Sequence, residues 1–307
     1  MNRRNLLKLT GTTVITAALP SITMAGTKED KTQFRYCLNT STISGQTTDL
    51  LRQIDIAAEA GYDGVELWIT TIKEYLAKGK SLSSLANYLS DRKLKVENII
   101  SFTTWMVNDT DKHKDGVKNL EEEMKIAAAL DCRRIAAPPA GVEKHDPIDF
   151  LQVGGYYHDI LALGREYRVI PQLEFWGASG TLYHLGQALA IAAAADDPDA
   201  CILADIYHLF RGGSGFNGLK LVGAKGIEIV HMNDYPATKP VNEQTDSDRV
   251  YPGDGAAPFE QIIHDLRMMG GVKVLSLELF NKTYWREDPV QVAKTGLQKM
   301  KSIVGHH

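Results

Sequence analysis

Four short segments of the sequence indicate the fold: IPQLE (170–174), CILAD (201–205), IEIVH (227–231) and VLSLE (274–278). Each consists mainly of residues that favour β-strands, and each ends on a carboxylate or an imidazole that loop residues follow. The strands of a parallel barrel present side chains at one rim in this way, because their carboxyl ends all meet at the same edge. The side chains of Glu174, Asp205, His231 and Glu278 are therefore expected to converge.

The same alternation of strand and helix continues on both sides of this stretch. Further strands are predicted at 34–39, 63–67, 95–100 and 134–137, and helices at 47–60, 82–90, 117–130, 150–167, 182–195, 216–223, 258–269 and 289–304. Eight such units in one continuous domain, 34–307, predict the α/β class and a single closed (β/α)8 TIM barrel. An open doubly wound sheet is the alternative, but no glycine-rich dinucleotide-binding turn follows the first strand.

The first 25 residues differ from the rest of the chain. A weakly apolar stretch that ends in small residues follows three basic residues, Arg3, Arg4 and Lys8. This pattern predicts an export signal at 1–25, and a polar linker follows at 26–33. The paired arginines favour the twin-arginine route over general secretion. We therefore expect a periplasmic or otherwise exported protein.

Charge and cysteine content narrow the function classes. Loss of the signal would remove three positive charges, 3 Lys/Arg and no Asp/Glu, and take the formal net charge from -4 to -7, which disfavours a nucleic-acid partner. Cys37, Cys132 and Cys201 lie in or beside apolar segments, where buried free thiols are expected and neither disulfides nor cysteine–metal sites. No apolar run of membrane-spanning length occurs, so no membrane association is expected after cleavage. Association into a homo-oligomer is left open.

The four converging side chains predict a metal site. Any one of them, taken alone, is more often a helix cap or a hydrogen-bonded neighbour, but four in successive strands form a strong joint signal. Three carboxylates and one imidazole suit one divalent cation, with Mn²⁺ expected and Co²⁺, Mg²⁺ and Zn²⁺ as alternatives. Such a cation stabilises an enediolate when a C–H next to a ketone is deprotonated. Glu174 and Glu278 are the candidate proton-transfer groups, and Asp205 and His231 serve mainly as ligands.

Substrate contacts are expected from five residues at the same rim. They are Asn39 at the end of the first strand, His208 in DIYH, Arg249 in the long loop 232–256, and Trp105 and Trp176 just beyond strand ends. An arginine on such a loop suits substrate oxygens, and the indoles suit the apolar face of a sugar ring. Each aromatic residue has rim packing as an equal alternative.

Seven motifs are distinctive: CLNTST (37–42), GYDGVELW (61–68), LEFWG (173–177), LADIYHL (203–209), VHMNDYP (230–236), DSDRVYPGDGA (246–256) and LSLELFNKTYW (275–285). Together they resemble the xylose isomerase-like TIM-barrel superfamily of sugar isomerases and epimerases, and among its members most the inosose (2-keto-myo-inositol) isomerases. The resemblance implies that Glu174, Asp205, His231 and Glu278 bind one divalent metal. It also implies that the two glutamates transfer protons, that His208 and Arg249 contact substrate, and that the substrate is a small carbohydrate or cyclitol.

Three other functions remain as alternatives. Thr40 and Ala178 stand where the inosose isomerase pattern is expected to carry a Glu and a His, so the substrate is open. With a 3-keto-glycoside, the same metal and base would expel the glycosidic group, which is a lyase reaction. An exported sugar-binding protein without turnover is the second alternative. An apurinic endonuclease is the third and weakest, because the ends of the second and third strands offer no extra histidine ligands.

Overall fold

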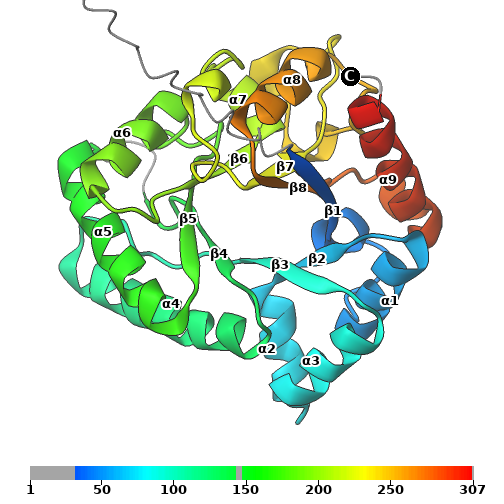
Figure 1. The fold of residues 1–307 in the computed structure, drawn as a ribbon, viewed down its shortest axis with the longest axis horizontal. Helices are drawn as coiled ribbons and strands as arrows, with labels where there is room; N and C mark the ends of the chain where they lie inside the picture. Colours follow the sequence, from blue (N-terminus) through cyan, green and yellow to red (C-terminus); the bar gives the residue numbers. More distant parts are fainter. Residues whose placement is uncertain (1–31, 143–146, 306–307) are drawn as a thin grey trace, which may run out of the picture.

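The structure is a closed barrel of eight parallel strands with helices outside it (Figure 1). It is a computed structural model that describes residues 32–142 and 147–305. The strands are β1 (Gln33–Asn39), β2 (Gly64–Trp68), β3 (Lys95–Ile100), β4 (Arg134–Ala137), β5 (Ile170–Glu174), β6 (Ile202–Asp205), β7 (Ile229–Met232) and β8 (Val272–Leu277). They pair in chain order, and β8 closes on β1, so the predicted single TIM barrel is confirmed.

The helices cover the outside of the strands. They are α1 (Leu50–Ala60), α2 (Ile69–Ala77), α3 (Leu82–Asp91), α4 (Thr110–Ala129), α5 (Phe150–Tyr167), α6 (Leu185–Ala195), α7 (Ile206–Arg211), α8 (Phe259–Met269) and α9 (Pro289–Gly305). Their apolar faces and the outward residues of the strands form the main hydrophobic core. Such a layer of helices is what a fully parallel sheet requires, because both faces of its strands must be buried.

The inside of the barrel is divided into an apolar and a polar part. A small second core contains one residue from each of six strands: Cys37, Ile100, Ala136, Leu203, Ile229 and Val274. Because side chains alternate along a strand, the residues two positions further toward the carboxyl end point into the barrel as well. On β6 and β7 these residues are Asp205 and His231. The period of two therefore places these two predicted ligands at the carboxyl-terminal rim of the barrel.

Several helix predictions need correction, and helix α4 begins at Thr110 and not at the predicted residue 117. Helix α2 was not predicted, and the helix expected at 216–223 is only a 3-10 turn, Leu219–Leu221, in a glycine-rich segment of low helix propensity. The helix that follows β6 is instead the short α7, which Asp205 caps through its side chain. Helix α1 begins later than predicted, because the Asp49 carboxylate accepts hydrogen bonds from the first free backbone N–H groups.

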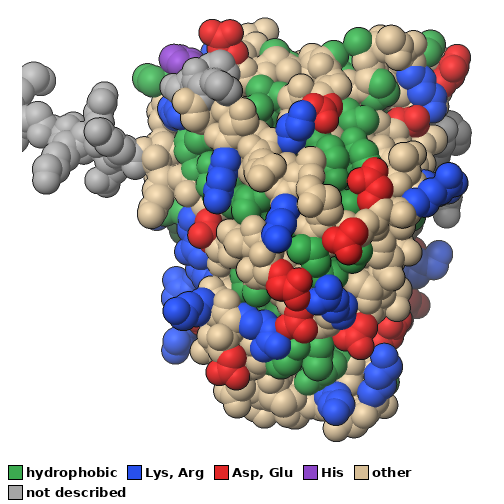
Figure 2. Space-filling model, turned by 90° about the vertical axis from the view of Figure 1, so that its right-hand side faces the viewer, with side chains coloured by type: hydrophobic (Ala, Val, Ile, Leu, Met, Phe, Trp, Pro, Cys, Tyr) green, Lys and Arg blue, Asp and Glu red, His purple; other side chains and the backbone are tan. Residues whose placement is uncertain are grey.

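All three cysteines are buried free thiols, as predicted. Within the described residues, no helix is both long and apolar enough to cross a membrane. The side of the barrel that carries α1 and α9 shows intermixed positive and negative side chains with scattered apolar groups, and no patch of a single sign (Figure 2). The predicted export signal at 1–25 and most of the linker at 26–33 lie outside the described residues, so both stay predictions.

Candidate metal centre

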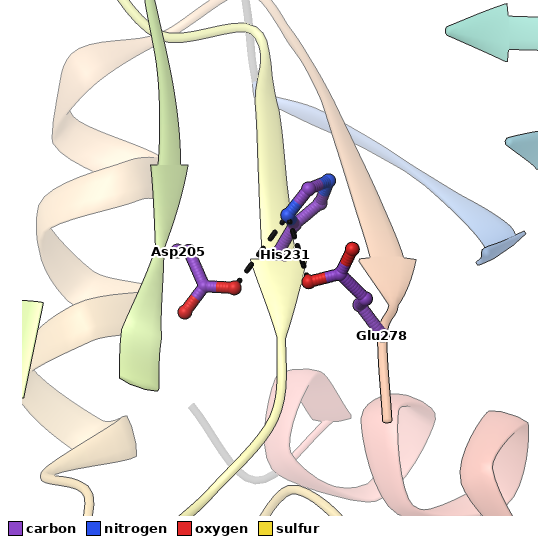
Figure 3. A group of neighbouring side chains, drawn as sticks. All are labelled: Asp205, His231 and Glu278. Carbon is purple, nitrogen blue, oxygen red and sulfur yellow. Dashed lines mark ion pairs between the residues drawn. The ribbon is translucent and has the colours of Figure 1, made fainter. Parts of the chain in front are cut away.

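Asp205, His231 and Glu278 come together at the carboxyl ends of β6, β7 and β8 (Figure 3). The Nδ1 atom of His231 lies 3.1 Å from Glu278 Oε2 and 3.5 Å from Asp205 Oδ2. All three residues are buried, and Nδ1 has no hydrogen-bond partner among the described residues. A buried nitrogen without a partner, next to two carboxylates, fits a divalent cation, since imidazole and carboxylate are both common ligands of such ions. This group could therefore hold a divalent metal.

Glu174 lies next to this group of three residues but further from His231 than Asp205 and Glu278 do. Its Oε1 lies 3.8 Å from His231 Nδ1, and its side chain lines the adjoining cavity. Burial, with the negative charges of Glu278 and Asp205 added, outweighs the attraction of His231 and raises the pKa of Glu174 to about 8. A carboxyl group with a pKa near neutrality is suited to both give and take a proton. The sequence predicted that Glu174 lies at this rim, but it did not predict that Glu174 stands apart from the group of Asp205, His231 and Glu278.

Glu66 orients His231 and was not predicted as a site residue. Its Oε1 lies 3.0 Å from His231 Nε2, which donates to it. Burial opposes the charge of His231, but Glu278, Glu66 and Asp205 outweigh it and raise its pKa, so Nδ1 also carries a proton in the metal-free protein, and a metal at Nδ1 would take the place of that proton. Asn98 and Ser276 donate to the same carboxylate over 2.7 and 2.6 Å. Burial disfavours the charge of Glu66, but His231 and these donors prevail and lower its pKa. Metal-binding histidines are commonly held by such a carboxylate.

Arg249 is the cation that the structure places against the two carboxylates. Its Nη1 donates to Asp205 Oδ2 over 2.8 Å and to Glu278 Oε2 over 2.7 Å. The guanidinium carbon lies 4.9 Å from the ring centre of Tyr207 and 5.2 Å from that of Phe280. Burial opposes the charge, but Asp205 and Glu278 outweigh it and raise the pKa of Arg249. The arginine thus neutralises the same oxygens that face His231.

His208 is neutral and offers one free donor. Burial lowers its pKa to about 4, and its Nε2 lies 3.3 Å from Arg249 Nη2. Because the arginine can only donate, Nε2 accepts and the proton of the neutral ring is on Nδ1. Nδ1 has no partner among the described residues, and His208 lines the cavity. This arrangement suits a hydrogen bond to a substrate oxygen, the role predicted for His208.

The cavity above the carboxylates has a volume of about 570 Å³, within the usual range for small-molecule sites. Its walls include a chain of four aromatic rings, in which Trp68 packs against Phe102 and Phe280, and Phe102 against Trp176. Trp176 therefore lies where it was predicted. Aromatic walls over a polar floor suit a sugar ring, which has both an apolar and a hydroxylated side.

Two predicted substrate contacts are corrected by the structure. Trp105 is fully buried in the core, where its indole N–H donates to the carbonyl of Pro138, and it does not line the cavity. Asn39 is also fully buried and does not line the cavity. Its amide nitrogen donates to Glu66 and Glu278 over 2.8 and 3.0 Å. Asn39 therefore positions carboxylates instead of contacting substrate.

The long loop after β7 is an ordered cover that carries Arg249. Its fold depends on Asp234, whose carboxylate accepts hydrogen bonds from the backbone N–H groups of Gly253, Gly255 and Ala257. A side chain on Gly255 would collide with the Asp234 carboxylate and the Tyr235 carbonyl, so only glycine fits there. The loop thereby holds Arg249 over the site.

The fold and the site together define a TIM-barrel protein with a metal-binding rim. The sequence of residues 54–303 matches the family described as xylose isomerase-like TIM barrel, and the chain belongs to this family. The inosose isomerase of Halalkalibacterium halodurans is 25% identical over 283 residues, which cover 89% of this chain and 97% of that protein. A crystal structure described as the IOLI protein with a binding zinc atom is 24% identical, covers 89% of this chain and 98% of its own, and has a TM-score of 0.81. The structure of an L-ribulose 3-epimerase is 17% identical, covers 89% and 95%, and has a TM-score of 0.71.

Proposed function

We propose that the protein is a divalent-metal-dependent isomerase or epimerase of a keto-sugar or keto-inositol. One observation carries the proposal: the group of Asp205, His231 and Glu278 adjoins a cavity with aromatic walls, and Glu278 and the neighbouring Glu174 line that cavity. Membership of the xylose isomerase-like family and the similarity to inosose isomerases support it. Activity on inosose itself is a separate question, since identity to those relatives is about a quarter.

The residues that would hold the metal are Asp205, His231 and Glu278, with Glu174 as the fourth. When bound, the cation would polarise a substrate carbonyl and make the neighbouring C–H more acidic. Mn²⁺ remains the proposed ion, and Zn²⁺ gains weight from the zinc in the related crystal structure. Carboxylate and imidazole donors accept either ion.

The proton transfers are proposed for Glu174 and Glu278, which come from β5 and β8 and border one cavity. One removes a proton from the carbon next to the carbonyl, and the other returns one to the enediolate of the substrate. The raised pKa of Glu174 matches such a role near neutral pH. His208 donates from Nδ1 to a substrate oxygen, and the aromatic walls exclude water from the reacting carbon.

A 3-keto-glycoside lyase is the second candidate, and the size of the cavity favours it. A single sugar ring would fill only part of about 570 Å³, which leaves room for a glycosidic group. The same base would remove the proton, and the glycosidic oxygen would leave with its bonding electrons and be protonated. An exported binding protein without turnover is a third, which only a test of turnover separates from the others.

Hydrogen exchange in D₂O tests these proposals. The purified protein with added Mn²⁺ or Zn²⁺ is incubated with inososes, ketoses and 3-keto-glycosides, and C–H exchange is followed by NMR. Exchange with an intact carbon skeleton supports the isomerase, and exchange with release of the glycosidic group supports the lyase. If Glu174→Gln and Glu278→Gln variants exchange as fast as the wild type, the proton transfers assigned to these residues are wrong.

A further inference from the structure

A second cavity of about 260 Å³ adjoins the main one and has a different lining. Its polar part consists of four hydroxyl side chains and one amide: Thr40, Ser41, Ser44, Thr71 and Gln53. Among the described residues that line it, none carries a charge. A lining of this kind suits a neutral, hydroxylated ligand, whereas a phosphate or carboxylate group would need a cationic partner.

The two cavities meet at a pair of aromatic rings. Trp68 and Phe280 line both cavities, and their ring centres are 6.1 Å apart in an edge-to-face arrangement. The indole N–H of Trp68 donates to Asn39 Oδ1 over 2.9 Å, which fixes the orientation of this ring. Both rings are only half-buried. A ligand that occupied both cavities would therefore contact both of these apolar rings.

Two residues that line the second cavity each have a buried polar atom without a partner among the described residues. These atoms are Ser41 Oγ and Gln53 Oε1, and each residue is only 2% exposed. The amide nitrogen of Gln53 donates to the carbonyl of Thr47 over 2.8 Å, so its oxygen is the atom left without a hydrogen bond. Leaving a buried polar atom unsatisfied costs about 1–3 kcal/mol. The Gln53 oxygen can accept a hydrogen bond, and the Ser41 hydroxyl can donate or accept one. Sugar hydroxyl groups can satisfy both.

We propose that the second cavity binds a second, neutral hydroxylated ring, and that the substrate is a glycosylated keto-sugar of disaccharide size. This inference rests on the proposed function, because it takes the keto-bearing ring to lie over the carboxylates of the main cavity. The aromatic pair lies between the two rings, where the apolar faces of sugars pack well. Sugar phosphates do not fit the second cavity, because it has no cationic side chain.

Neighbouring threonines on α2 provide a matched pair of variants. Thr71 lines the second cavity, and Thr71→Leu fills part of it. Thr70 is exposed and does not line it, so Thr70→Leu is the control for the effect of leucine on the helix. Ser41→Ala removes one unpartnered hydroxyl without adding volume. Neither Thr71 nor Ser41 touches Asp205, His231 or Glu278 through any hydrogen bond in the described part of the chain.

The test measures binding without turnover and then exchange. Binding of glucose, maltose, cellobiose, trehalose and glucose 6-phosphate to the metal-loaded protein is measured by calorimetry. We expect at least one disaccharide to bind about tenfold more tightly than glucose, and Thr71→Leu and Ser41→Ala to remove about that factor, as expected for one or two lost hydrogen bonds. Thr70→Leu should change nothing. If no disaccharide binds better than glucose, or if Thr71→Leu keeps the preference, the second cavity is not a sugar subsite.

The same variants separate this inference from the proposed function. Exchange in D₂O into a free keto-sugar, with no preference for disaccharides, would refute the subsite and leave the isomerase in place. A disaccharide preference that depends on Thr71, without exchange into any keto compound, would support the subsite and refute the proposed turnover.

Discussion

Arg249 and a metal ion are expected to compete for the same two carboxylates. In the structure, Arg249 Nη1 contacts Asp205 Oδ2 and Glu278 Oε2, the oxygens that also lie nearest to His231 Nδ1. Arg249→Gln removes the cation and leaves two buried carboxylates without their counter-charge. Breaking a buried ion pair in this way costs about 3–5 kcal/mol. For a barrel of this size, at about 2 °C per kcal/mol, the metal-free variant should melt roughly 6–10 °C below the wild type.

The metal should restore most of this loss, because it supplies the missing positive charge. If about 3 kcal/mol is recovered on binding, the variant should bind the ion roughly 100-fold more tightly than the wild type. The assay compares melting temperatures of EDTA-treated protein with and without Mn²⁺ or Zn²⁺, and metal affinity by calorimetry. Arg211→Gln is the control, since Arg211 contacts Tyr207 but neither carboxylate. An equal metal-induced shift in Arg249→Gln and wild type would refute the competition.

Three further predictions test the site and the N-terminus. Glu66→Gln should lower metal affinity about 10–100-fold with little change in secondary structure by circular dichroism, because His231 loses the carboxylate that orients it. In the metal-free protein the pKa of Glu174 is about 8, above its usual value of 4.5. The contribution of this carboxyl group to the stability of the fold is therefore fully present below pH 4.5 and is lost as the pH rises through 8. Glu174→Gln should therefore match the wild type in denaturant unfolding near pH 5 and exceed it at pH 9, and a constant difference would contradict the raised pKa. Replacing Arg3 and Arg4 by lysine should abolish export in cell fractionation, whereas unchanged export would exclude the twin-arginine route.

The convergence of the metal group was predictable from sequence because it follows from strand periodicity. Asp205 and His231 each end an apolar run, and a parallel barrel brings such ends together. Glu66 was missed although it lies on β2 in GVELW, a buried strand in which a carboxylate is unusual. That signal was present in the sequence, but its meaning depends on His231, 165 positions further along the chain.

The errors have a different physical origin. Trp105 was expected at the rim because it follows a predicted strand, but its indole is buried in the core against Tyr157. Sequence spacing gives the distance from a strand end and not the direction of the loop. The short α7 was missed because six residues are too few for helical periodicity to appear. Its cap, Asp205, is also a predicted ligand, and one carboxylate serves both purposes because its two oxygens face different partners.

Asn39 links the walls of the cavity to its chemistry. Its Oδ1 accepts from Trp68, and its Nδ2 donates to both Glu66 and Glu278. Because the amide oxygen of Asn39 is bonded to Trp68 and its nitrogen to the two glutamates, the amide cannot rotate without breaking hydrogen bonds to both. Trp68, which lines both cavities, is therefore fixed relative to Glu278, and a ring that packs against it would lie at a defined distance from Glu278. Position along the chain reveals none of this, because the contacts join the ends of β1, β2 and β8.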